Sequence, residues 1–286
     1  MVGSLSFLRT RRLGMTCLRM PPYTRTLEPV IKAPPSKPVQ RSVNIRRIIK
    51  ELLHRLPPHD EFITTLDPAA DPAIAFAVGI AGYHVCQAFT FRISPTQQLE
   101  DIWSSLEKRT RNMIRSAGRR LTIVESTDFS RFERISSRER VTKGTTHDYG
   151  VLRRLYEAAA ARGQAMLRFA VQENGTDAAA VIAVWDCDIM YYWTSARDRD
   201  ADVNGGNALL LWECVRAANE RGLTLDFDGY CSPGAARFLA GFAWEPVVRP
   251  VVTFSSIRFR LARLGQEALR RGLHTAHHGA GAEGQM

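Results

Sequence analysis

The chain has 286 residues, of which 45% are hydrophobic, and its 39 Lys and Arg against 29 Asp and Glu give a net charge of +10. This length has room for one large domain or two small ones, with the apolar fraction of an ordinary globular protein. No apolar run reaches the roughly eighteen residues needed to cross a bilayer, so we expect a soluble protein without a membrane span. The cysteines are scattered singly with no Cys-x-x-Cys pair, which favours a reducing compartment, the cytoplasm, and no metal site.

Residues 1–40 are basic and rich in proline, with six prolines between positions 21 and 40. Proline disfavours helix, so this lead-in is expected to be extended or looped. The first 25 residues contain several arginines and no acid. We interpret them as a flexible basic tail, with an organelle transit peptide as the alternative.

Residues 41–130 alternate between helical and strand-like patterns. Apolar positions at helical spacing predict a helix over 43–56, and β-branched and aromatic runs predict strands over 61–66 and 83–93. One long helix over 95–118 and a short strand over 121–124 complete this half.

Residues 145–256 are expected to form a second domain, which opens with a helix over 149–161. Three strand-like runs follow, at 165–172, 178–185 and 189–195. Asn174-Gly175 joins the first two, and Asn-Gly between apolar runs is a strong hairpin signal, so the three strands should form an antiparallel meander.

After the meander, the pattern predicts a helix over 206–221, a strand over 223–228, a short helix over 233–240 and a strand over 244–254. A meander followed by helix, strand, helix and strand indicates a mixed sheet. The fold class is therefore α/β with a mixed sheet, followed by a helix and flexible tail over 257–286.

The turn Asn204-Gly205-Gly206-Asn207 opens the predicted helix that continues through Ala208. Glycines let the backbone approach a ligand closely, and the first-turn N–H groups and helix dipole suit a phosphate. The simpler interpretation is an asparagine N-cap with a glycine loop.

Asp226 and Asp228 should lie on one side of the strand that ends beside Tyr230. Ligands commonly bind at this end of strands in open α/β sheets. A carboxylate there suits a general base, and Tyr230 suits a general acid or substrate anchor. Alternatively, Asp228 closes an Asx turn and Tyr230 packs at the rim.

Lys108, Arg111, Arg115 and Arg119 follow helical spacing on one face of the predicted long helix. Such a basic stripe suits a phosphate-bearing partner, although charged helix faces are usually only solvated.

Several segments, in order, resemble the GNAT-type acyltransferases of the FemAB-like and BioF2-like group. The resemblance covers roughly residues 101–254 and implies a GNAT fold, in this group often two units in tandem, here with the first incomplete. It rests on Lys108–Arg115, Gly206–Glu213, Arg221-Gly222-Leu223, Asp226–Gly229, Arg237-Phe238 and Gly241-Phe242.

The resemblance implies an N-acyltransferase that moves an acyl group from acyl-CoA, as co-substrate, to an amine-bearing small molecule by direct attack. Val203 stands where the family's phosphate loop has Arg or Gln. An aminoacyl-tRNA donor, as in FemAB proteins, and a non-catalytic binding protein therefore stay open as alternatives. The implied site has Gly205, Gly206, Asn207 and Ala208 on the donor phosphates, Asp228 and Tyr230 in catalysis, and Lys108, Arg111, Arg115 and Arg237 on the substrate or polyanion.

Overall fold

The computed structural model describes residues 2–32, 35–229, 232–242 and 245–279, with the backbone alone for 269–279. The chain forms two compact units. Unit 1 combines residues 1–88 with 249–286, and unit 2 is the continuous segment 89–248. This division differs from the expected boundaries at 41–130 and 145–256, and the assignment of two GNAT-like halves stays a prediction.

Unit 1 holds a two-stranded sheet and a larger sheet. In the first, β1 pairs antiparallel with β4. In the second, the order is β2-β3-β5-β12, with only the β3–β5 pair parallel. The strands are β1 (Val2–Ser4), β2 (Leu8–Arg12), β3 (Met15–Arg19), β4 (Val30–Lys32), β5 (Glu61–Thr65) and β12 (Pro246–Ser255), whose first three residues belong to unit 2.

The beginning of the chain is not the flexible tail that its composition suggested. Residues 2–32 contribute four strands, and Cys17 and Leu18 in β3 are fully buried. The arginines of β2 remain exposed on the outer strand of the larger sheet. The composition did not indicate these strands, because the exposed charged residues outnumber the few core residues that β3 supplies.

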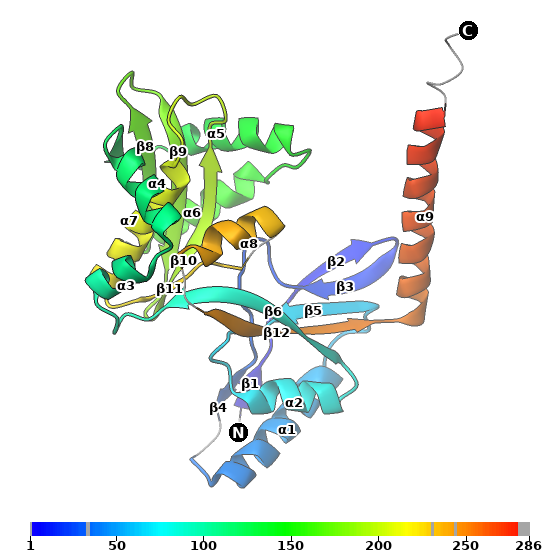
Figure 1. Cartoon of the computed structure of the whole chain (residues 1–286). Coiled ribbons are helices and arrows are strands. Elements are labelled where there is room, and N and C mark those ends of the chain that lie inside the picture. Colours follow the sequence, from blue (N-terminus) through cyan, green and yellow to red (C-terminus); the bar gives the residue numbers. More distant parts are fainter. Residues whose placement is uncertain (1, 33–34, 230–231, 243–244, 280–286) are drawn as a thin grey trace. The chain divides into compact units, whose positions relative to one another are not determined.

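Three helices belong to unit 1: α1 (Pro38–His54), α2 (Pro72–Ile80) and α9 (Ile257–Gly279) (Figure 1). Helix α1 begins five residues earlier than predicted, because Pro38 occupies the first turn, where no N–H partner is required. Helix α2 was not predicted. It is apolar almost throughout, so its sequence has no helical periodicity.

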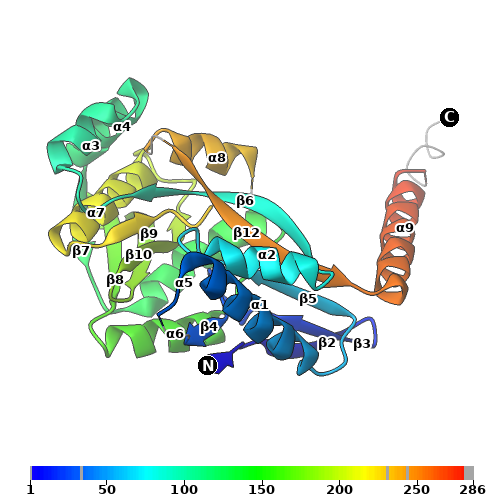
Figure 2. The same cartoon turned by 90° about the horizontal axis from the view of Figure 1, so that it is seen from below.

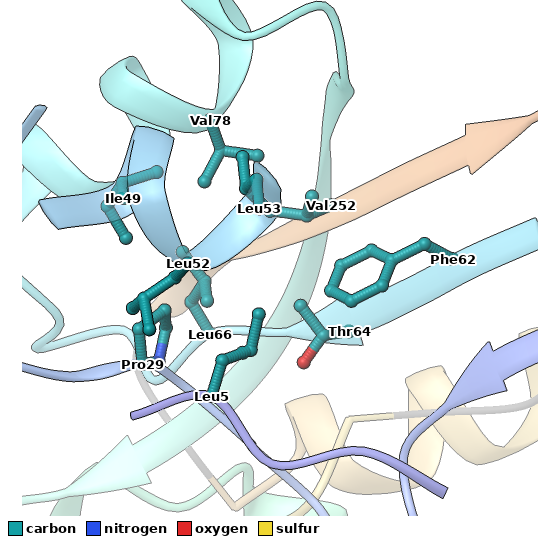
Figure 3. Close-up of a pocket in the computed structure, with 10 residues that line it drawn as sticks. All are labelled: Leu5, Pro29, Ile49, Leu52, Leu53, Phe62, Thr64, Leu66, Val78 and Val252. Atoms are coloured by element: carbon teal, nitrogen blue, oxygen red, sulfur yellow. The ribbon is translucent and has the colours of Figure 1, made fainter. Parts of the chain in front are cut away.

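The core of unit 1 contains a small cavity beneath α1, lined by Ile49, Leu52 and Leu53 among others (Figure 3). Its volume is about 10 Å³. A space of this size holds at most one water molecule, and the lining carries a single polar side chain, Thr64. The cavity is therefore a packing defect rather than a ligand site.

Unit 2 is built on a six-stranded mixed sheet of order β6-β11-β10-β9-β8-β7. Strands β8, β9 and β10 form the predicted antiparallel meander, and β10 pairs parallel with β11. The strands are β6 (His84–Ile93, in unit 2 from Phe89), β7 (Leu121–Glu125), β8 (Ala165–Gln172), β9 (Asp177–Trp185), β10 (Ile189–Arg197) and β11 (Thr224–Asp226). The predicted mixed α/β sheet is confirmed.

Helices cover both faces of this sheet (Figure 2). Alternate residues of β9 point to opposite faces, and Ala179, Val181 and Ala183 pack in the main core with α7. Helices α5 and α6 cover the other face. The helices of unit 2 are α3 (Leu99–Ser105), α4 (Lys108–Gly118), α5 (Phe129–Thr142), α6 (Tyr149–Ala160), α7 (Gly206–Glu220) and α8 (Pro233–Ala240).

The predicted long helix over 95–118 is two helices. The chain is extended at Leu106 and Glu107, where ψ is 146° and 140°. The Glu107 N–H donates to the Gly241 carbonyl at 3.2 Å, and Arg111 donates to the Leu106 carbonyl at 2.9 Å. These contacts stabilise a break that neither Gly nor Pro marks in the sequence. None of the described helices offers an apolar stretch long enough to cross a membrane.

Candidate functional site

The sheet of unit 2 opens between β10 and β11. The two strands pair only from Ile189 to Tyr191, opposite Thr224 to Asp226, whereas β10 continues to Arg197. A bulge in the β9–β10 pairing follows at Tyr192 to Thr194. A gap at the carboxyl end of adjacent parallel strands is a common ligand-binding position in α/β sheets.

The start of α7 explains why two glycines are needed there. Gly205 has φ +94°, and a Cβ on it would lie 2.9 Å from Met113 Cγ and 3.2 Å from Ala117 Cβ in α4. A Cβ on Gly206 would lie 2.9 Å from Ala179 Cβ in β9. The close approach that requires glycine is thus to the protein itself, and a ligand role at this turn rests on the backbone N–H groups.

Those N–H groups belong to Gly206, Asn207 and Ala208. The first helical hydrogen bond runs from the Leu209 N–H to the Gly205 carbonyl at 2.9 Å. The three preceding N–H groups have no intrahelical acceptor, and the positive end of the helix dipole lies with them.

Three side chains near this turn differ in environment. Ala208 and Val203 are buried in the main core, and this packing explains why an apolar residue stands at position 203. Asn207 is half-buried, and its Oδ1 is enclosed without a hydrogen-bond partner in the described part of the chain. An enclosed acceptor of this kind is costly unless a ligand or water donates to it.

The end of β11 is held by β6. Asp226 is fully buried and accepts hydrogen bonds from Thr90 Oγ1 at 2.6 Å and from Arg92 Nε at 2.7 Å. It also accepts from the Asp228 N–H at 2.7 Å, and the Gly229 N–H donates to Thr90 Oγ1 at 3.0 Å. We call these residues the Asp226 clamp. It fixes the turn that follows β11.

The predicted strand over 223–228 is too long, because β11 ends at Asp226. Asp228 has φ +66° and Gly229 has φ +70°, so alternation along a strand no longer places the Asp228 side chain. Asp228 is half-buried. Tyr230 lies outside the described residues, as does Cys231.

Sequence and structure comparisons fit this geometry. Residues 104–238, all within unit 2, match the family model described as an acetyltransferase (GNAT) domain. The chain contains a GNAT acyltransferase domain. Acyl transfer is therefore the general activity of this domain, and the predicted GNAT fold is confirmed. No curated protein sequence matches the chain.

The similarity of the chain to solved structures extends beyond the GNAT domain. FemX superposes with a TM-score of 0.61 at 12% identity, covering 92% of this chain and 90% of FemX. The C-terminal domain of a putative lysylphosphatidylglycerol synthetase from Agrobacterium fabrum gives 0.53 at 12% identity, covering 82% and 79%. A conserved protein of unknown function from Bacteroides thetaiotaomicron gives 0.54 at 10% identity, covering 84% and 82%. At these identities the likeness concerns the fold.

The basic residues of the GNAT domain are only partly free for a ligand. Arg111 donates to carbonyls at the end of α3, including that of Leu106. The Arg115 guanidinium lies 5.3 Å from the centre of the Trp103 ring. Lys108 is exposed at the start of α4. Arg237 lies on α8, exposed beside the groove described below.

A buried thiol in α7 of the GNAT domain is unsuited to nucleophilic catalysis. Burial raises the pKa of Cys214 to about 12, which leaves the thiol protonated at neutral pH.

Among the described residues, the group of three or more His, Cys, Asp or Glu side chains close enough to hold a metal ion is Asp186, Cys187 and Asp188. All three are exposed in the turn between β9 and β10. Asp186 Oδ1 accepts from the Asp188 and Ile189 N–H groups at 2.9 and 2.8 Å, so its role is to shape the turn.

Thr90 and Arg92 are functional candidates that the sequence did not reveal. They lie 136 and 134 residues before Asp226, to which they donate. The only signal is the alternation in Phe89-Thr90-Phe91-Arg92-Ile93, which places the two polar side chains of this segment on one face.

Proposed function

We propose that the GNAT domain transfers an acyl group from acyl-CoA to the amine of a small molecule by direct attack on the thioester carbonyl. The observation that carries this proposal is the start of α7. There, three N–H groups without intrahelical acceptors lie at the positive end of the helix dipole, and Gly206 packs on Ala179 of β9, which pairs with Arg197 in the part of β10 that extends beyond β11.

The residues present fit the donor. The N–H groups of Gly206, Asn207 and Ala208 suit the oxygens of a pyrophosphate. Asn207 Oδ1 is an acceptor and would not pair with a phosphate oxygen, so it is suited to a hydroxyl or amide N–H of the same donor. A left-handed Gly205 supports this by turning the chain into the helix without a side chain.

Asp228 is the residue that we place on the acceptor. An attacking amine must lose a proton, and a half-buried carboxylate in a fixed turn is suited to accept it. The Asp226 clamp holds the Asp228 backbone, so the clamp residues act as positioning residues. Tyr230 as the acid that protonates the leaving thiolate stays a prediction from the sequence.

Donor binding is the first test. Calorimetry with acetyl-CoA should show binding to the wild type and about tenfold weaker binding to Asn207→Ala, the loss of one buried hydrogen bond. Asn112→Ala, an exposed asparagine of α4, is the matched control and should bind like the wild type. Failure of the wild-type protein to bind acetyl-CoA would contradict the proposal.

Catalysis is the second test. Release of CoA thiol from acetyl-CoA should be followed with a panel of amines. Asp228→Asn, which keeps a residue tolerant of positive φ, should lower the rate at least about a hundredfold with acetyl-CoA affinity unchanged. Asp202→Asn, an exposed loop residue, is the control. Binding without any thiol release would instead indicate a non-catalytic binding protein.

A second candidate is an aminoacyl-tRNA donor, which the exposed Lys108 on α4 and the fold likeness to FemX favour. Binding of tRNA that weakens steeply with salt, and weakens further in Lys108→Ala, would support it. Arg111→Ala is a poor probe because that side chain stabilises the junction of α3 and α4.

A further inference from the structure

A concave surface in unit 2 lies beside the proposed catalytic turn. It is a groove of about 360 Å³ lined by Phe89 and Phe91 of β6, Ala236, Arg237 and Ala240 of α8, and Pro246 at the start of β12. This volume falls within the range of small-molecule sites.

The groove is apolar apart from one cation. Phe91 forms its buried floor at 7% exposure, whereas Phe89 is 38% exposed and offers a ring to a ligand. Alanines and a proline complete the lining, so no side chain there donates or accepts a hydrogen bond except Arg237. Such a surface binds a flat or branched apolar body.

Arg237 gives the groove its charge preference. In the described part of the chain, its guanidinium makes one weak hydrogen bond, from Nε to the Pro233 carbonyl at 3.4 Å, and no ion pair. Its Nη groups are therefore not committed to an acidic side chain there. A guanidinium beside an apolar surface is suited to bidentate pairing with a carboxylate.

The groove is connected to the turn that carries Asp228. Phe89 and Phe91 flank Thr90, whose hydroxyl accepts the Gly229 N–H at 3.0 Å. A Cβ on Gly229 would lie 2.9 Å from the Phe89 carbonyl oxygen, so the turn rests directly on the strand that lines the groove.

We propose that this groove binds the acyl acceptor, and that the acceptor is an apolar α-amino acid or a close analogue. Its side chain packs on Phe89 and Phe91, and its carboxylate pairs with Arg237. The inference rests on the proposed acyl transfer for the role of the bound amine, while the binding itself does not depend on the donor.

The test compares L-phenylalanine with phenethylamine, which has the same ring and amine but no carboxylate, by calorimetry on the full chain. The wild type should bind L-phenylalanine about tenfold more tightly. Arg237→Gln should remove this difference and leave phenethylamine binding unchanged. Arg162→Gln, an exposed arginine between α6 and β8, is the matched control and should keep it.

A second variant tests the groove itself. Ala240 is exposed on α8, so Ala240→Trp should fill the groove without disturbing the core and should weaken both amines about tenfold or more. A thermal melt like that of the wild type would show that the fold is intact. Equal affinity of the wild type for the two amines, or no binding of either, overturns the proposal.

Titration of the same samples with acetyl-CoA separates the two proposals. Acetyl-CoA binding without amine binding would contradict the acceptor groove and leave the donor proposal standing. Arg237-dependent binding of L-phenylalanine without acetyl-CoA binding would do the reverse.

Discussion

Each unit contains a buried carboxylate that joins chain segments far apart in the sequence, and the two differ in the cation that they hold. In unit 1, Asp60 accepts hydrogen bonds from the Thr16 N–H at 3.2 Å, from Ser256 Oγ at 3.0 Å and from Arg258.

In unit 2, Asp226 accepts hydrogen bonds from Thr90, Arg92 and the Asp228 N–H. The Arg258 side chain is 74% exposed and that of Arg92 only 12%.

This difference determines how much each carboxylate contributes to the free energy of unfolding. An exposed guanidinium stays hydrated when its partner is lost, whereas a buried one is left in a medium of low dielectric constant. We therefore expect the Asp226 clamp to be the stronger and the less tolerant of substitution. The clamp also lies at the proposed catalytic turn, whereas Asp60 is structural.

Asp226→Ala should have the largest effect, lowering the free energy of unfolding by about 3–5 kcal/mol, because the substitution removes a fully buried carboxylate that pairs with the largely buried Arg92 guanidinium. Chemical denaturation of the full chain measures it. The double variant Asp226→Ala with Arg92→Leu should recover part of the loss. A loss below about 1 kcal/mol in the single variant would contradict an ion pair that is shielded from water.

Asp60→Ala should cost less, about 2–3 kcal/mol, because it removes hydrogen bonds to a charged acceptor while Arg258 stays hydrated. The same denaturation experiment compares it with Asp226→Ala. If the two variants lose equal stability, exposure of the cation is not what separates the two sites.

Thr90→Val should lower the free energy of unfolding by about 1–2 kcal/mol, since the hydroxyl donates to Asp226 and accepts from the Gly229 N–H. Thr64→Val is the matched control. The hydroxyl of that buried threonine donates to the Leu27 carbonyl at 2.5 Å. Only Thr90→Val should also lower the rate of acyl transfer, because only Thr90 holds the turn that carries Asp228.

Arg258→Ala should have the smallest effect at neutral pH, because the exposed ion pair is screened by solvent, and the effect should decrease with added salt. It should be clearer in acid. The hydrogen bond from Arg258 lowers the pKa of Asp60 below its usual value, with Ser256 adding to the effect. A lowered carboxyl pKa in the folded state contributes stability above the unfolded pKa of about 3.9, which is lost as the pH falls through the folded pKa.

Acid unfolding of Arg258→Ala should therefore begin at a higher pH than that of the wild type. Circular dichroism between pH 5 and pH 2 measures the shift. Identical acid transitions would show that Arg258 does not stabilise the ionised Asp60.

The sequence predicted the parts of the fold that depend on neighbouring residues. Asn174-Gly175 and alternating apolar residues predicted the meander, and helix α8 begins and ends where Pro233 and Ala240 indicated. The mixed sheet followed from these elements.

Features that depend on distant contacts were not predictable. The break between α3 and α4 depends on Gly241, 134 residues after Glu107. Strand β5 pairs with β12 so that Phe62 lies opposite Phe254. Helix α5 was not predicted because its buried positions, Phe129, Phe132 and Ile135, stand among charged residues.

The candidate site also combines local features that the sequence predicted with distant contacts that it did not. The glycines at the start of α7 were visible as a local pattern, although their packing against Met113 and Ala179 was not. Asp226 was visible as a strand-end carboxylate. Its partners Thr90 and Arg92 come from another part of the chain, so its structural role required the fold.

The exposed thiols offer a way to watch the two units during a reaction. Of the described cysteines, Cys86 in unit 1 and Cys187 in unit 2 are exposed, whereas Cys17 and Cys214 are buried. The hydrogen bond with Asp188 raises the pKa of Cys187, so this thiol should react more slowly with a maleimide than an ordinary surface cysteine. Sequential labelling would then place a fluorescent donor on one unit and an acceptor on the other, and energy transfer would report any movement as substrates bind.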